Sequence, residues 1–129
     1  MQRLLCCVLI MFLGSATALQ ADEPRGAQLE LSSKVVDLGT LSQSDDKQRV
    51  VVAYRNVGDV PLVVTEVRTS CSCTSSIYDR KRVMPDAEGQ ITFVMDPSKA
   101  PEGSFYRVVQ IYSTSIGGVS YLTIKAEIE

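Results

Sequence analysis

The sequence RVVVAYRNVGD, residues 49–59, contains the clearest strand of this chain and the turn that ends it. Val50, Val52 and Tyr54 fall on one face of an extended backbone, and the residues between them fall on the other. β-branched and aromatic residues favour a pleated, half-buried surface, and asparagine, glycine and aspartate tolerate the backbone of a turn. We therefore predict a strand over residues 49–56, followed directly by a chain reversal.

Shorter strand patterns continue on both sides of this segment. Before it, the pattern predicts strands over residues 27–31 and 34–39 and a polar loop over residues 42–47. After it, the pattern predicts strands over residues 62–69 (with a bulge near Thr65-Glu66), 74–78, 90–95, 105–113 and 119–128, with a hairpin turn at residues 116–118. The side chains expected to point into the core are Ile91, Phe93, Met95, Phe105, Val109, Ile111, Leu122, Ile124, Ala126 and Ile128.

The number and spacing of these strands indicate the fold class. The chain carries about seven or eight short strands with turn signals every eight to twelve residues or so, and no helical periodicity longer than its apolar N-terminal run. This pattern is typical of an all-β protein, specifically an immunoglobulin-like antiparallel β-sandwich. Antibody-type domains also carry distant cysteines and a core tryptophan, and this chain has no tryptophan.

The first 21 residues have the composition of a secretory signal peptide. Arg3 gives a positive start, and an apolar run and several small residues follow. The Ala-x-Ala pattern predicts cleavage after Ala18, and cleavage after Ala21 fits equally well. We therefore expect residues 1–21 to be a signal peptide and residues 22–129 to form one exported domain, periplasmic or secreted. The alternative is a leader that is not cleaved and remains as a membrane anchor. We expect no other contact with a membrane.

The composition argues against several functional classes. The formal net charge is −2, so the chain lacks the positive field that attracts nucleic acid. It contains no histidine, which is the commonest general base at neutral pH and the commonest metal ligand. We therefore expect no enzyme, no catalytic, cofactor-binding or metal-binding residues, no cofactor and no small-molecule substrate.

Two of the four cysteines remain after removal of the leader, and they form the candidate disulfide or thiol pair Cys71 and Cys73. In an extended strand such residues lie about 6.5–7 Å apart, at or beyond the usual limit of about 6.8 Å for a disulfide. The chain must therefore turn sharply at Ser72 to join them. The alternatives are a structural disulfide or inert pair, a redox pair, a site for copper(I) or zinc completed by other ligands, and a bond to a partner protein.

Several short motifs together resemble one protein family. They are Val36-Asp37-Leu38-Gly39, Asn56-Val57-Gly58-Asp59-Val60-Pro61-Leu62, Ser70-Cys71-Ser72-Cys73-Thr74, residues 85–89 and Leu122-Thr123-Ile124. Over Val35 to Ile128 the sequence resembles the domain-of-unknown-function 1573 family. The resemblance implies an exported bacterial domain, similar to the immunoglobulin-like sandwiches of the Hydin and major-sperm-protein type, and it implies no settled activity.

The chain departs from the family pattern at two positions. The family usually has glycine between the two cysteines, where this chain has Ser72, and glycine after the proline of a turn, where this chain has Asp86. If the position of Ser72 required a positive φ angle, serine would cost about 1 kcal/mol there. Either the loop differs in this chain, or that position is not left-handed.

These observations lead to two functional hypotheses. The first is an exported β-sandwich interaction or structural module that contacts a protein or cell-envelope partner through its surface or an edge strand. The alternative is a thiol-redox or copper-handling protein that acts through Cys71 and Cys73.

Overall fold

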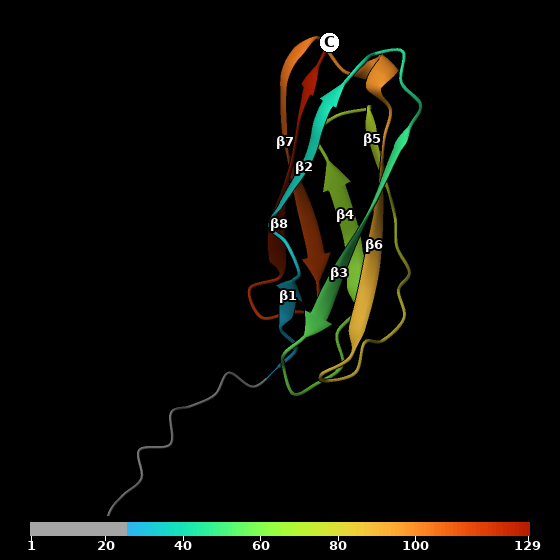
Figure 1. Ribbon diagram of the computed structural model, residues 1–129. Helices are drawn as coiled ribbons and strands as arrows, with labels where there is room; N and C mark the ends of the chain where they lie inside the picture. The colour runs from blue at the N-terminus through green and yellow to red at the C-terminus, as the bar shows by residue number, and fades with distance from the viewer. Residues whose placement is uncertain (1–25) are drawn as a thin grey trace, which may run out of the picture.

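The computed structural model describes residues 26–129 of the protein. The predicted signal peptide, residues 1–21, and both predicted cleavage sites lie outside the described residues. The described chain folds into two facing sheets of four strands each (Figure 1). No helix within residues 26–129 is long and apolar enough to cross a membrane.

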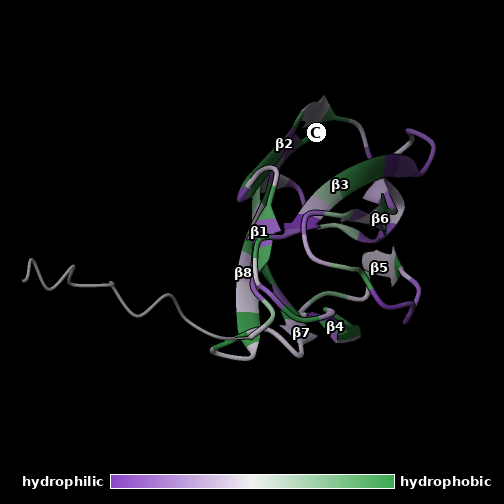
Figure 2. Ribbon diagram, turned by 90° about the horizontal axis from the view of Figure 1, so that it is seen from below, coloured by the Kyte–Doolittle hydropathy of each residue, from purple (hydrophilic) through white to green (hydrophobic). Residues whose placement is uncertain are grey.

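The strands divide equally between the sheets, which appear as two layers when the sandwich is seen from one end (Figure 2). The first sheet has the order β1-β3-β6-β5, with β1 at Leu29–Leu31, β3 at Gln48–Asn56, β6 at Glu88–Met95 and β5 at Thr74–Ile77. The second has the order β2-β8-β7-β4, with β2 at Val35–Leu41, β8 at Val119–Ile128, β7 at Gly103–Ser113 and β4 at Val64–Thr69. The predicted all-β sandwich is confirmed.

The strongest sequence patterns form strands where they were expected. Residues 49–56 lie in β3, with Val52 and Tyr54 buried and Val50 packed against the core. The bulge predicted near Thr65-Glu66 appears as a shift in the register between β4 and β7. All ten side chains predicted to point inward from β6, β7 and β8 are buried: Ile91, Phe93, Met95, Phe105, Val109, Ile111, Leu122, Ile124, Ala126 and Ile128.

Some details differ from the prediction. The strand expected from residue 62 begins at Val64. Leu62 instead forms an isolated bridge with Val83, because the two residues exchange both backbone hydrogen bonds (2.8 and 2.7 Å). Between the strands predicted over residues 90–95 and 105–113 the chain forms a short 3-10 helix, η1 (Pro97–Lys99), which the Asp96 side chain caps.

One pair of strands within the sandwich is parallel, although the pattern predicted an antiparallel one. β2 runs parallel to β8, with Val36 opposite Ile124. The cause is the short link between β1 and β2, which moves the chain from the first sheet to the second without reversing its direction. Such a long-range pairing leaves no trace in local alternation.

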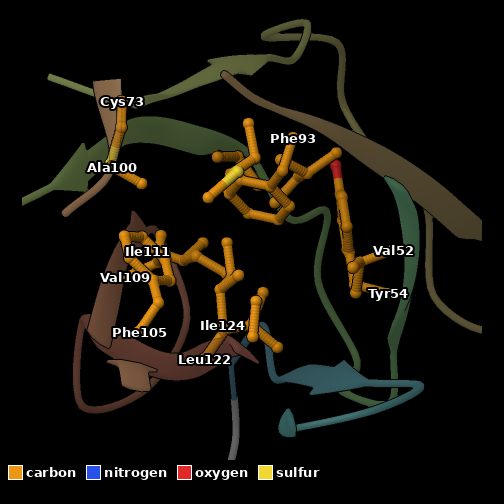
Figure 3. Packing of buried hydrophobic residues seen from close by; sticks show 14 of the residues in the cluster. Val52, Tyr54, Cys73, Phe93, Ala100, Phe105, Val109, Ile111, Leu122 and Ile124 are labelled. Atoms are coloured by element: carbon orange, nitrogen blue, oxygen red, sulfur yellow. The ribbon is translucent and has the colours of Figure 1, made fainter. Parts of the chain in front are cut away.

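The core lies between the two sheets. Phe93 of the first sheet and Leu122 and Ile124 of the second point toward one another across the layers (Figure 3). Burial of a large apolar side chain contributes about 1.5–3 kcal/mol, so this layer supplies most of the driving force for folding.

Asn56 is the main polar residue in the interior, and it is fully buried. Its side-chain oxygen accepts hydrogen bonds from the backbone N–H groups of Gln28 (3.3 Å) and Gly58 (3.0 Å). Its side-chain nitrogen donates to the carbonyl groups of Val60 (2.7 Å) and Val83 (2.9 Å). One carboxamide therefore joins the N-terminal segment, the turn after β3 and the segment before β6.

The turn after β3 also holds the start of the described chain. The Asp59 side chain accepts a hydrogen bond from the backbone of Gly26 (2.6 Å), and the Asp59 N–H donates to the Gly26 carbonyl (3.1 Å). A Cβ atom added at Gly58 would overlap the backbone of Gly26 and Ala27. Glycine is required there because two backbone segments touch.

Candidate functional site

The Cys71-Ser72-Cys73 segment forms the corner that carries the chain from one sheet to the other. β4 of the second sheet ends at Thr69, and β5 of the first sheet begins at Thr74. Cys71 and Cys73 are joined as a disulfide, with their Cα atoms 5.2 Å apart. The chain therefore makes the sharp turn at Ser72 that such a bond requires.

Ser72 does not adopt the left-handed backbone. Asp86, with φ of 66°, is the one residue other than glycine with a positive φ in the described part of the chain. The serine at this position therefore carries no left-handed strain. The second departure from the family pattern, Asp86, is the one that occupies a backbone suited to glycine.

The two sulfur atoms lie in different environments. Cys73 is only 2% exposed and lies beside Ala100 at one end of the core (Figure 3). Cys71 is half-buried, and its sulfur accepts a hydrogen bond from the Cys73 N–H (3.2 Å). The Cys73 carbonyl accepts another from the Asp96 N–H (2.7 Å), which ties the corner to the end of β6. These contacts join the corner to the core and to the first sheet.

No observation favours the redox or copper-handling alternative. Arg68, the nearest cation before the motif, forms an ion pair with Glu66 (2.9 Å) and stacks on Tyr112 at 5.0 Å. Within residues 26–129 no three histidine, cysteine, aspartate or glutamate side chains lie close enough together to hold a metal ion.

The corner leaves part of β7 without a neighbour on one side. The last paired residue of β4, Thr69, lies opposite Val109, whereas β7 begins six residues earlier, at Gly103. Beside this stretch is a hollow of about 490 Å³, lined by residues from the end of β4 and the first half of β7, including Arg68, Ser70, Tyr106, Arg107 and Val108. Both arginines and an exposed tyrosine thus border one depression.

The outer face of the second sheet carries an uncharged stripe. Val35, Thr123 and Val108 lie in one row across β2, β8 and β7. Tyr121 lies in the row on one side and Tyr106 in the row on the other, and they are 58% and 61% exposed. The alternating pattern of the strands did not predict this face, although apolar residues at both alternating positions of β7 were a signal for it.

The charged groups that border this stripe are paired with one another. Lys125 lies 3.7 Å from Asp37 at one end, and Arg68 pairs with Glu66 at the other. The hydrogen bond from Arg68 lowers the pKa of the Glu66 carboxyl group.

The uncharged row of Val35, Thr123 and Val108 lies between these charged groups. Tyr106 lies opposite Lys125, and Tyr121 lies in the row of Arg68, so the two exposed rings flank the uncharged row beside paired charges. Aromatic rings and methyl groups are enriched where proteins meet.

Residues 29–128 match the model of a family described as a protein of unknown function, DUF1573. The chain belongs to the DUF1573 family. The resemblance inferred from the short motifs is therefore confirmed. No curated protein matches the sequence.

Solved structures similar to this DUF1573 domain agree on the fold. A protein of unknown function from Porphyromonas gingivalis W83 is 23% identical, with a TM-score of 0.69 over 78% of this chain and 46% of that one. The ASH/PapD-like domain 7 of human CEP192 is 6% identical, with a TM-score of 0.66 over 90% of this chain and 95% of that domain. WR4, a C. elegans MSP family member, is 9% identical, with a TM-score of 0.52 over 80% and 99%.

These likenesses confirm an immunoglobulin-like sandwich of the PapD and major-sperm-protein type. The DUF1573 domain spans about half the length of the Porphyromonas protein. At these identities the likeness extends to the fold alone.

The geometry explains two of the motifs that carry the family resemblance. In the DUF1573 domain, Asn56 and Gly58 fasten the N-terminal segment to the sandwich. Cys71 and Cys73 end β4 early and send the chain to the other sheet. The first motif therefore holds two segments of the sandwich together, and the second lies where β4 ends, beside the hollow.

Proposed function

We propose that the protein is an exported, non-enzymatic interaction module that contacts a protein of the cell envelope through the outer face of the β2-β8-β7-β4 sheet. The exposure of Tyr106 and Tyr121 on that face is the observation that carries the proposal. Tyrosine supplies a large apolar ring and a polar hydroxyl at low entropic cost, so it is enriched where proteins meet. Export rests on the leader sequence, and the absence of histidine supports a non-catalytic role.

The experiment is a capture assay on envelope extracts with immobilised mature protein. The variant carrying Tyr106→Ala and Tyr121→Ala is compared with Val51→Ala, because Val51 is 56% exposed on the outer face of the other sheet. Aromatic residues often act as hot spots, so we expect the tyrosine pair to lose at least about tenfold in capture. The Val51 variant should capture its partner as the parent protein does.

A second arm separates this proposal from the thiol alternative. Cys71→Ser with Cys73→Ser removes both sulfurs, and a binding module should still capture its partner. In the loop-entropy model a three-residue loop contributes only about 1.6 kcal/mol, so this variant should remain folded. Equal capture by the tyrosine variant and the parent protein, or loss of capture only in the cysteine variant, would refute the proposal.

A further inference from the structure

The backbone of β7 presents unpaired groups where β4 has turned away. The N–H of Ser113 donates a hydrogen bond to the Gly118 carbonyl (3.0 Å) at the end of the β7–β8 hairpin. Along an antiparallel pair every second residue is hydrogen-bonded to its partner, so the residues of β7 that bond to β8 are counted back from Ser113 in steps of two. Phe105 and Arg107 therefore direct their backbone groups toward β8. Ser104 and Tyr106 direct theirs to the opposite side, beyond the end of the pairing with β4 at Thr69.

The structure protects this edge with a side chain of its own. Arg107 stacks on Phe105 at 4.9 Å and donates a hydrogen bond from its guanidinium group to the carbonyl of Tyr106 (2.8 Å). That carbonyl is one of the groups that face the open side. Charged side chains at open edges prevent uncontrolled strand pairing. Here the protection depends on the bond from Arg107 to the Tyr106 carbonyl, and a backbone N–H of another chain could take the place of that bond.

The charges around the hollow indicate the chemistry of an occupant. Arg68 and Arg107 line it, and no carboxylate does. Arg68 already pairs with Glu66, whereas Arg107 has no carboxylate partner in residues 26–129. Planar guanidinium groups bind carboxylates with two parallel hydrogen bonds, so Arg107 is suited to an acidic group.

We propose that the open edge of β7 at Ser104 and Tyr106 receives an extended segment of a partner protein whose carboxylate side chain pairs with Arg107. The backbone N–H of the segment replaces Arg107 at the Tyr106 carbonyl, and the released guanidinium turns to the carboxylate. The five residues from Ser104 to Val108 span about 17 Å, which suits a strand of about four to six residues. This inference rests on the proposed interaction function and names one element of the partner.

A second copy of this chain is a poorer occupant for the same edge. Pairing β7 with β7 of another copy would bring Arg68 and Arg107 of both molecules to one short strip. Like charges that face each other across paired strands destabilise the pairing. The acidic partner segment removes this repulsion and gains an ion pair.

The test uses a displayed library of random seven-residue peptides, selected on the mature protein. We expect enriched sequences with β-branched residues around one aspartate or glutamate. The synthesised peptide should bind Arg107→Glu at least tenfold more weakly, and it should bind Arg49→Glu, a charge reversal at an exposed arginine of β3, as it binds the parent protein. A peptide with lysine in place of its acid should regain binding to Arg107→Glu.

Amide NMR on the same complexes locates the peptide. The N–H groups of Ser104 and Tyr106 should shift and become protected from exchange, and Tyr106→Pro, which removes one of them, should abolish binding. Enrichment of no peptide family, of peptides without an acid, or of peptides that shift β5 or β2 instead would overturn the inference. If Arg107→Glu still captures the envelope partner while the tyrosine variant does not, the interaction function stands and the strand-addition site fails.

Discussion

At the scale of single residues, Asn56 has the largest role that the sequence only partly reveals. It is the only asparagine of the chain, and the sequence shows it as a turn former. In the structure its side chain makes four hydrogen bonds from a fully buried position. Gly58 and Val60 belong to the turn itself, but Gln28 and Val83 lie 28 and 27 residues away, so no local pattern could predict those two bonds.

Replacement of Asn56 by alanine should lower the free energy of unfolding by about 3 kcal/mol or more. The change removes four hydrogen bonds, and the partly buried backbone groups of Gln28, Gly58 and Val60 lose these partners. A lost hydrogen bond costs about 0.5–1.5 kcal/mol, and about 1–3 kcal/mol where the remaining group stays away from water. Chemical denaturation of the mature protein measures the loss. The matched control is Gln90→Ala, because Gln90 is exposed and its truncation should change stability by less than about 0.5 kcal/mol. Equal effects of the two substitutions would show that the hydrogen bonds are not stabilising.

Asp86 provides a second prediction at this scale, because its φ of 66° suits glycine. Asp86→Gly should leave stability unchanged or raise it by up to about 1 kcal/mol, since relief of the left-handed strain is partly offset by the entropy of glycine. The exposed ion pair with Arg55 (3.4 Å) contributes little.

The matched change Asp86→Val tests the same backbone position with a residue that should destabilise it. A β-branched residue is poorly suited to positive φ, so this variant should lose about 1–2 kcal/mol in the same denaturation assay. If valine were as stable as aspartate, the left-handed conformation of residue 86 would be wrong.

At the scale of the elements, β3 and β6 are joined by a contact between an aromatic ring and a glycine. Tyr54 lies directly opposite Gly89, and its buried ring covers that glycine. A Cβ atom added at Gly89 would overlap the ring. The glycine at the start of β6 is therefore a packing requirement.

Gly89→Ala should destabilise the protein by about 1–3 kcal/mol, the usual range for overpacking a filled site. In a Tyr54→Leu background the same substitution should cost much less, because the ring that it meets is gone. A double-mutant cycle from denaturation curves measures this coupling. Additive effects of the two substitutions would contradict the proposed contact.

The sequence predicts a strand well where apolar and polar residues alternate clearly, because this pattern does not depend on which strand it pairs with. β3 and β8 follow directly from their alternating apolar residues, because each has one face on the core. The parallel pairing of β2 with β8 depends on where a short link places the chain, so it could not be predicted. The sequence located Cys71 and Cys73, but it could not show that their corner ends β4 and exposes the edge of β7.

At the scale of the whole molecule, the free energy of unfolding should fall in acid, and protonation of the Asp96 and Glu66 carboxyl groups should contribute to the fall. Hydrogen bonds from Ser98 lower the pKa of Asp96, and the hydrogen bond from Arg68 lowers that of Glu66. At a given pH these two carboxyl groups therefore bind protons more readily in the unfolded state than in the folded state. The stabilisation is present above the unfolded pKa values near 4, and it is lost as the pH falls through the folded ones.

Thermal unfolding between pH 6 and pH 2.5 measures this loss. The variant with Asp96→Asn and Glu66→Gln should lose less stability over this range than the parent protein does. A parallel decline of both proteins would show that other groups cause the acid sensitivity.

The sandwich as a whole separates the scaffold from the proposed surface of contact. Asn56 and its neighbours fix one end, the core joins the sheets, and the outer face of the β2-β8-β7-β4 sheet carries the exposed tyrosines. Substitutions on that face should therefore affect binding with little effect on stability. The hollow beside β7 adds a place where a partner segment could extend the sheet.

Site-specific photo-crosslinking in the cell that makes the protein tests the proposed interaction face most directly. A photoreactive phenylalanine analogue is placed at Tyr106, at Tyr121 or, as the control, at Val51 on the opposite sheet. We expect one discrete crosslinked partner from both tyrosine positions and none from position 51. The absence of any crosslink from the tyrosine positions, or the same products from all three, would contradict the assignment of that face as the contact surface.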